Sequence, residues 1–257
     1  MRQPRLAEMI AGRLRDDILS GRLKEGDALG RQEIFTEFRV SLPAMREAMR
    51  ILETEGLISV RRGNVGGAIV HLPTPMRVAQ TISMILQARG TTMADVSGTL
   101  AQIEPICAGM CARREDRHET VVPALRTAIE VQEADFDDPQ EYNTNARKFH
   151  EAIVAHCGSD TMTVMVGALE AIWSAHESSV WREAETPDGT DADAPMAMRT
   201  RLRALRDHEK ILEAVDNGDA ERAMALSAAH LSATRNSTLT SSSDTQVQTK
   251  LLSPTGS

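Results

Sequence analysis

Apolar residues recur every three or four positions over most of this sequence, which is the spacing of one face of an α-helix. Between residues 76 and 235 the pattern is broken by Pro, Gly and acidic stretches. Aromatic residues make up 3% of the 257 residues, whereas Met occurs 13 times, so a core must be built from aliphatic and Met side chains. This composition favours packed helices over sheets. We therefore expect a mainly α fold.

The first part of the chain predicts three helices. A helix of about four turns is expected over residues 5–20, and a short second helix over 31–38. The third begins after Ser41, a residue type suited to the N-cap, with Pro43 in its first turn. Gly56 ends it.

A hairpin follows the third helix. Two short β-favouring runs, 57–62 and 68–70, flank a Gly-rich tip at 63–67. Three helices followed by a two-stranded hairpin form a winged helix-turn-helix. We assign this domain to residues 1–72 and a stiff, Pro-containing linker to 73–76.

The remainder is expected to be an all-α antiparallel helical bundle over residues 77–235. Residues 183–195 are acidic and lack apolar anchors, which predicts a loop. The Ser- and Thr-rich residues 236–257 predict a disordered tail. Candidate helices span 76–89, 92–115, 118–135, 139–157, 160–183, 196–216 and 219–235.

Charge is distributed unevenly along the chain. Residues 1–71 hold 12 Lys and Arg against 10 Asp and Glu, whereas the rest holds 17 against 27. A small positive recognition module on an acidic body fits these counts, although chance fluctuation fits them equally well. The overall charge of -8 argues against a protein that binds nucleic acid over its whole surface.

The sequence contains no apolar run long enough for a membrane span, and its charged N-terminus is unlike a signal peptide. We expect a cytoplasmic protein without a membrane partner. Cys107 and Cys111 show no metal or redox spacing and are expected to be buried on one helix face.

The N-terminal motifs IAGRLRDDILSGRLKEGDAL, AMREAMRILETEGLI and RRGNVGGAIV lie in order along the first domain. Together they resemble the DNA-binding domain of the GntR family of bacterial transcription regulators. The resemblance implies DNA binding, with one departure. Leu42 stands where the family usually has an arginine that commonly contacts DNA.

Arg46 and Arg50 lie four residues apart on the third helix, where long donors can reach guanine edges or phosphates. In an arbitrary protein such a pair is more often a solvated face, and arginines beside a hairpin are more often a polar edge. A homodimer on a two-fold double-stranded operator is expected, with strongly salt-dependent affinity. The candidate DNA contacts are Arg31, Ser41, Arg46, Arg50, Arg61, Arg62 and Gly63.

The C-terminal sequence DHEKILEAVDNGDA, from Asp207 to Ala220, precedes a further His-Leu pair at 230–231, and Lys-Phe-His occupies 148–150. These motifs resemble the FCD effector domain of FadR-like GntR regulators. The resemblance implies that a small metabolite, such as an organic acid, binds within the helical bundle.

Spacing independently brings two histidines together. His208 precedes Gly218 by ten residues and His230 follows it by twelve, so each lies roughly 15–18 Å from the turn of a helical hairpin. If His150 faces the same interior, three imidazoles converge as a metal set. Zinc is the first choice, with nickel, manganese or another divalent ion as alternatives. Three hydrogen-bonded core histidines without metal are the competing interpretation.

Two departures from the FCD pattern concern this site. Many family members complete it with an Asp four residues before the first His, where this chain has Ala146, so an ion would rely on three histidines plus water or an effector oxygen. Leu100 replaces an arginine often found four positions before Glu104. Trp173 and His176 are candidate pocket residues, with plain core packing as the alternative for the tryptophan.

The leading hypothesis is a ligand-responsive transcription regulator, most often a repressor in this family, whose operator affinity changes when a metabolite binds. A constitutive DNA-binding regulator with a degenerate, metal-free pocket is the first alternative. A three-histidine metal-dependent enzyme is the second, but no general base or nucleophile motif accompanies the histidines. We therefore expect no enzymatic activity.

Overall fold

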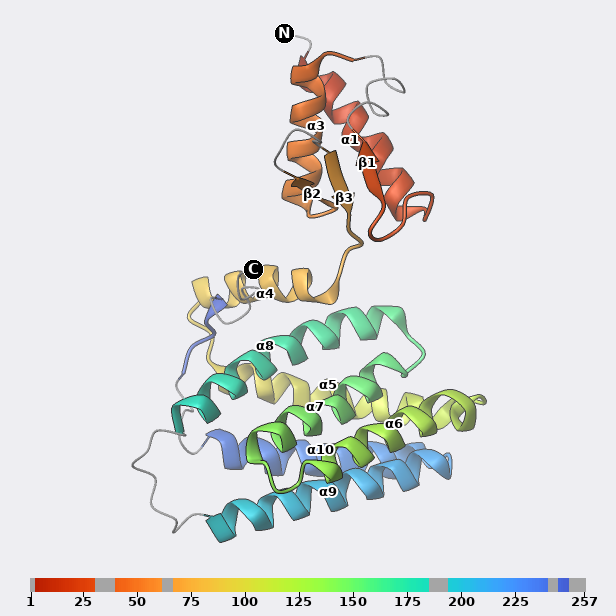
Figure 1. The fold of residues 1–257 in the computed structure, drawn as a ribbon. Helices are drawn as coiled ribbons and strands as arrows, with labels where there is room; N and C mark the ends of the chain where they lie inside the picture. The colour runs from red at the N-terminus through yellow and green to blue at the C-terminus, as the bar shows by residue number, and fades with distance from the viewer. Residues whose placement is uncertain (1–2, 31–39, 62–66, 185–193, 240–244, 250–257) are drawn as a thin grey trace. The chain divides into compact units, whose positions relative to one another are not determined.

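The computed structural model describes residues 3–30, 40–61, 67–184, 194–239 and 245–249. The chain divides into two compact units, Met1–Thr74 and Pro75–Ser257, each with its own hydrophobic core (Figure 1). Both units are built mainly from helices, which confirms the predicted fold class.

The first unit contains two described helices and a three-stranded antiparallel sheet. The sheet order is β1-β3-β2, with Ala28 and Ser59 on either side of Ile69. The hairpin of β2 and β3 was predicted, whereas β1 was not. The expected helix at 31–38 lies outside the described residues. The elements are α1 (Gln3–Leu19), β1 (Ala28–Gly30), α3 (Leu42–Glu55), β2 (Ile58–Arg61) and β3 (Gly67–Val70).

Helix α3 begins and ends where its sequence predicts. Ser41 has an extended backbone at the N-cap, and a Pro occupies the first turn. Gly56 ends the helix in the left-handed region, at a φ of 72° that favours glycine. Ala48 and Leu52 are fully buried, and α3 packs against α1. The opposite face of α3 is therefore turned toward solvent.

The second unit is an all-helical bundle, and each helix predicted there is present with bounds shifted by a few residues. Helix α4 already begins at Pro75, so the connection expected over 73–76 ends at Thr74. Among the described residues, no helix is both long and apolar enough to cross a membrane. The helices are α4 (Pro75–Ala88), α5 (Met93–Arg113), α6 (Arg117–Ala134), α7 (Pro139–Ala155), α8 (Asp160–Ala184), α9 (Ala194–Asp216) and α10 (Ala220–Leu239).

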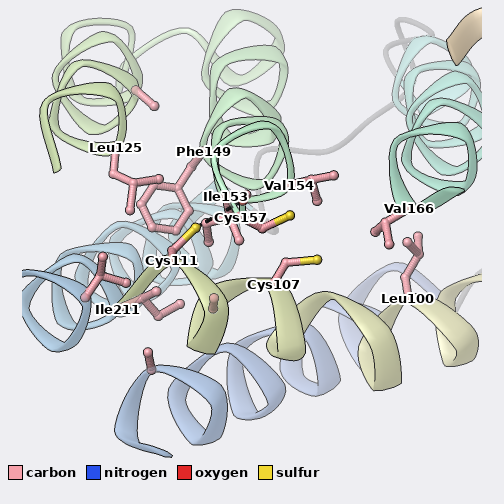
Figure 2. Packing of buried hydrophobic residues seen from close by; sticks show 14 of the residues in the cluster. Leu100, Cys107, Cys111, Leu125, Phe149, Ile153, Val154, Cys157, Val166 and Ile211 are labelled. Carbon is pink, nitrogen blue, oxygen red and sulfur yellow. Dashed lines mark hydrogen bonds between the residues drawn. The ribbon is translucent and has the colours of Figure 1, made fainter. Parts of the chain in front are cut away.

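Helix α5 passes through the centre of this bundle and packs closely against α10. A Cβ at Gly109 would lie 2.5 Å from the Cγ of Met224, so the close approach of the two helices requires glycine there. Figure 2 shows Cys107 and Cys111 of α5 in the core with Phe149 of α7. Both cysteines are buried, as predicted. Burial raises the pKa of both thiols to about 12, which makes them poor nucleophiles.

The expected disordered tail from residue 236 is wrong for the parts that the structure describes. Helix α10 continues to Leu239, and residues 245–249 return to the bundle. The amide of Met93 donates to the carbonyl of Thr245 at 2.8 Å, and the amide of Val247 donates to the carbonyl of Thr91 at 3.0 Å. Val247 is 1% exposed, so one apolar side chain and the backbone hydrogen bonds anchor this segment. Neither feature can be predicted from its Ser- and Thr-rich composition.

Candidate metal centre and nucleic-acid interface

The exposed face of α3 presents its two arginines differently. Arg46 is exposed, and within the described part of the chain its side chain makes no hydrogen bond or ion pair. The Nη2 of Arg50 lies 2.6 Å from the Oε1 of Glu47 one turn earlier. Because this pair is well exposed, it adds little stability and its arginine can exchange partners. Arg46 is the better candidate for a direct contact with nucleic acid.

The remaining predicted DNA contacts are only partly described. Ser41 is exposed, and its hydroxyl makes no capping hydrogen bond. Arg61 ends strand β2, but its side chain is not among those described. Arg31, Arg62 and Gly63 lie outside the described residues.

The three histidines that spacing predicted to converge do meet inside the second unit. His150 comes from α7, His208 from α9 and His230 from α10, and one ligand atom of each lies within 4.8 Å of the others. The Nε2 atoms of His208 and His230 are 3.2 Å apart. Among the described residues, this is the group of three or more His, Cys, Asp or Glu side chains close enough to share an ion.

Buried acceptors fix the orientation of two imidazoles. The Nδ1 of His150 lies 2.6 Å from a carboxyl oxygen of Glu104, and the Nδ1 of His208 lies 2.8 Å from the side-chain carbonyl of Gln132. An Nδ1–H that donates to such an acceptor leaves the lone pair on Nε2. Both rings therefore direct an unprotonated nitrogen toward the centre of the triad, as metal-binding histidines do.

The third imidazole is held from α9. The Nδ1 of His230 lies 3.8 Å from a carboxyl oxygen of Asp207, whose other oxygen is 3.1 Å from the Nζ of Lys210. Contact with His230, and then with Lys210, lowers the pKa of Asp207 to about 2. Phe149 stacks on the His208 ring at 4.1 Å between centroids, which restrains that ring.

The charge state and spacing of the triad suit a divalent ion. Burial lowers the pKa of His208 well below its ordinary value, and burial also lowers the pKa of His230. Burial therefore favours the neutral imidazole of both residues, which is the form that binds metal. Two nitrogens bound to one tetrahedral zinc lie about 3.4 Å apart, given zinc–nitrogen bonds of about 2.0–2.1 Å. The 3.2 Å between the Nε2 atoms of His208 and His230 is close to this value.

Among the described residues, the group close enough to share an ion consists of the three histidines, with no carboxylate in place of the aspartate missing at Ala146. The neighbouring Asn145 is buried, and its amide donates to Asp135 at 2.6 Å. The amide nitrogen of Asn145 is therefore used at the α6–α7 connection. Three nitrogens leave coordination positions for water or for an oxygen of a bound anion.

Two buried carboxyls adjoin the triad, and sequence reasoning assigned neither a role. Burial raises the pKa of Glu104 to about 7. Burial and the neighbouring Glu104 raise the pKa of Glu170, on α8, well above its ordinary value. Burial therefore favours the protonated form of both carboxyls. The signal for Glu104 is a single acidic residue within the apolar stretch of a long helix, whereas Gln132, Glu170 and Asp207 carried no comparable signal.

The candidate pocket residues lie on α8, close to this carboxyl pair. Trp173 follows Glu170 by three residues, and its ring centroid lies 6.0 Å from that of His176. Trp173 is 8% exposed and His176 is 4% exposed. Burial of this kind fits the wall of an internal pocket and ordinary core packing alike.

Two family models match parts of this chain, and solved structures resemble it. Residues 95–233 match the family model described as FCD domain, and residues 6–66 match that of the bacterial regulatory proteins of the gntR family. Among solved structures, the GntR protein of Streptococcus agalactiae is 19% identical, with 90% of this chain and 99% of that chain covered and a TM-score of 0.67. McbR/YncC of E. coli is 13% identical, with 92% and 98% covered and a TM-score of 0.46. The first of these likenesses supports the fold.

Proposed function

The chain belongs to the GntR family of bacterial regulatory proteins and carries an FCD domain, and from this premise we propose that it is a ligand-responsive transcriptional repressor. In this proposal the first unit binds operator DNA and the second binds a small metabolite bearing a carboxylate. Ligand binding favours one arrangement of the protein and thereby changes its operator affinity.

The observation that carries the proposal is the polarity of the histidine triad. Imidazoles from three helices meet in the interior, and their outer nitrogens face side-chain oxygens on α5, α6 and α9. His150, His208 and His230 would hold the divalent ion, zinc in the first place, with nickel or manganese as alternatives. Such an ion supplies positive charge for an anionic oxygen of the effector. Leu100, which stands where related sequences often carry an arginine, is buried in the core.

The DNA-binding half of the proposal rests on the exposed face of α3. Arg46 supplies a long, unpaired donor, and Arg50 becomes a second when it exchanges Glu47 for a phosphate. Ser41, at the start of the helix, offers its hydroxyl to a phosphate of the DNA backbone. Arg31, Arg61, Arg62 and Gly63 complete the proposed contact surface by their positions in the sequence.

We further propose that the protein acts as a homodimer on a two-fold operator in the cytoplasm. One winged head offers a small contact area, and two related heads match two half-sites. Helices α4 and α8 leave large apolar side chains exposed, which suits burial against a second copy. These are Met84, Ile85, Val164 and Met165.

The test is a titration of the zinc-loaded protein with labelled duplex DNA from beside its own gene. The titration is repeated with a series of small carboxylates, and again with His150→Ala in place of the native chain. We expect specific binding that a carboxylate weakens about 5- to 150-fold, the range of typical allosteric coupling. The substituted chain should bind DNA but lose most of its response to the ligand.

Three results would redirect the proposal. DNA binding that no carboxylate changes would identify a constitutive regulator with a degenerate pocket. A protein that ignores every flanking fragment would contradict operator binding itself. A carboxylate that strengthens binding would keep the sensor and reverse the assignment as a repressor.

A further inference from the structure

Helix α9 carries a cationic stripe along its exposed face. Arg199, Arg203, Arg206 and Lys210 follow one another at intervals of four, three and four residues, which places them on one side of the helix. All four side chains are exposed. The stripe spans about 16 Å at 1.5 Å per residue.

These side chains line a groove with a volume of about 440 Å³. Among the described residues its lining is completed by Leu202, which supplies an apolar surface, and by Asp207. Small-molecule sites commonly enclose roughly 300–1,000 Å³. The groove is therefore of a size to hold a small molecule.

The charges of the groove are only partly compensated from within. Asp207 lies 3.1 Å from the Nζ of Lys210 and 3.8 Å from the Nε of Arg203. In the described part of the chain, the side chains of Arg199 and Arg206 make no hydrogen bond or ion pair. The lining therefore holds one carboxylate and four cations, and among the described residues two of the guanidinium groups have no acceptor.

The surrounding unit decides between a small anion and a nucleic acid. The chain beyond residue 71 carries 17 basic against 27 acidic residues. A duplex extends over many screening lengths of about 8–10 Å and meets this acidic body, whereas a small anion senses the local cations of the groove. The apolar floor at Leu202 also suits a compact ligand with a carbon frame.

We propose that this groove is a binding site for a small multivalent anion, one with two or more phosphate or carboxylate groups. Guanidinium groups at Arg199 and Arg206 bind its oxygens in forked pairs, and Lys210 contributes a further point charge. The site goes beyond the proposed effector function, since it lies on the exposed face of α9 and does not use the three histidines. Asp207 is shared by the two sites, because it lines the groove and also contacts His230 of the triad.

Isothermal titration calorimetry of the full-length chain tests the site. Tripolyphosphate and citrate serve as separate probes, so that the better ligand identifies the phosphate or the carboxylate as the preferred group. The test variant is Arg199→Gln/Arg206→Gln, which removes two exposed donors and no internal contact. The control is Arg113→Gln/Arg126→Gln, which removes the same charge from exposed positions on α5 and α6.

We expect one anion per native chain, affinity about tenfold lower in the groove variant, and unchanged affinity in the control. No binding of either probe to the native chain would overturn the proposal, as would equal weakening in both variants. A lower salt slope of DNA binding in the groove variant alone would also overturn it, because DNA would then occupy the groove. The calorimetry needs no operator, so failure of the proposed regulatory function leaves its outcome readable.

Discussion

A buried imidazole carries its proton on one of two nitrogens, and its neighbours decide which. At His150 and His208 the choice is made by Glu104 and Gln132, which accept from Nδ1. These partners hold the two rings in place, while the Nε2 atoms of His208 and His230 lie 3.2 Å apart within the triad. The role of each histidine thus depends on a residue far from it in sequence.

Replacing one ligand should abolish metal binding. We expect the native protein to retain about one divalent ion per chain and His208→Ala to retain almost none, because two histidines form a much weaker site. His118→Ala is the control, since His118 is exposed and pairs with Asp216 away from the triad. Elemental analysis after exhaustive dialysis measures this, and equal metal content in all three proteins would refute the site.

The buried Glu170 should make stability depend on pH. Its pKa is raised in the folded state above the ordinary 4.5, so the folded chain binds an extra proton. The resulting stabilisation is complete below pH 4.5 and is lost as pH rises toward the folded pKa. Glu170→Gln does not lose this stabilisation. Its unfolding free energy should therefore rise relative to that of the native protein by up to about 1.4 kcal/mol for each pH unit above 4.5.

Thermal unfolding of both proteins between pH 5 and pH 8 measures this difference. The exposed Glu130→Gln on α6 is the control and should follow the native curve. Parallel curves for the native chain and Glu170→Gln would contradict the buried carboxyl.

Sequence reasoning brought the three histidines together but did not find their partners. Motif and spacing place His208 and His230 level in a hairpin because helical rise is regular. Gln132, in contrast, reaches His208 across 76 residues of sequence, and only the packing of α6 against α9 brings them together. The sequence shows Glu104 as an acidic residue within an apolar stretch, but it does not predict that His150 is its partner.

At the scale of elements, helical periodicity was a reliable guide and short extended segments were not. Each helix of the bundle repeats its apolar positions over several turns, so several parts of the sequence support the same helix. Strand β1 has three residues, too few to show alternation. Residues 245–249 are anchored chiefly by backbone groups and Val247, features that a Ser- and Thr-rich composition does not reveal.

Arg46 should be the most sensitive position on α3. We expect Arg46→Ala to weaken binding of the flanking duplex by about 1–3 kcal/mol, because a groove contact is lost without disturbing the buried face. Fluorescence anisotropy measures affinity, and far-ultraviolet circular dichroism checks that helix content is unchanged. Arg126→Ala on the second unit is the matched control, and equal affinity of all proteins would remove α3 as the recognition helix.

The returning C-terminal segment should contribute measurably to stability. Val247→Ala removes buried methyl groups and should lower the unfolding free energy by about 1–2 kcal/mol, or the melting temperature by several degrees. Met198→Ala on α9 serves as the control, since that side chain is 47% exposed. A melting temperature equal to that of the control would show that the segment does not pack in solution.

At the scale of the whole molecule, two separate cores predict two unfolding events. The buried clusters of Met1–Thr74 and Pro75–Ser257 contain different residues, and the histidine triad belongs to the second unit. Binding that favours one folded unit stabilises that unit alone.

Metal removal should therefore affect one transition. Differential scanning calorimetry of the zinc-loaded chain should show two transitions, and a chelator should lower only the one of the second unit. A loss of about 2.7 kcal/mol is expected if free zinc had stood at 100 times its dissociation constant. His208→Ala should not respond to the chelator, and a shift of both transitions, or of neither, would contradict the assignment.

The triad and its outer acceptors draw on α5, α6, α7, α9 and α10. Divergence among related regulators can therefore proceed by exchanging an acceptor on one helix while every histidine is kept. A lineage that replaces Gln132 or Glu104 would alter the basicity of a ligand and so the ion or metabolite preferred. Identical histidines in two such proteins would then be poor evidence that they sense the same compound.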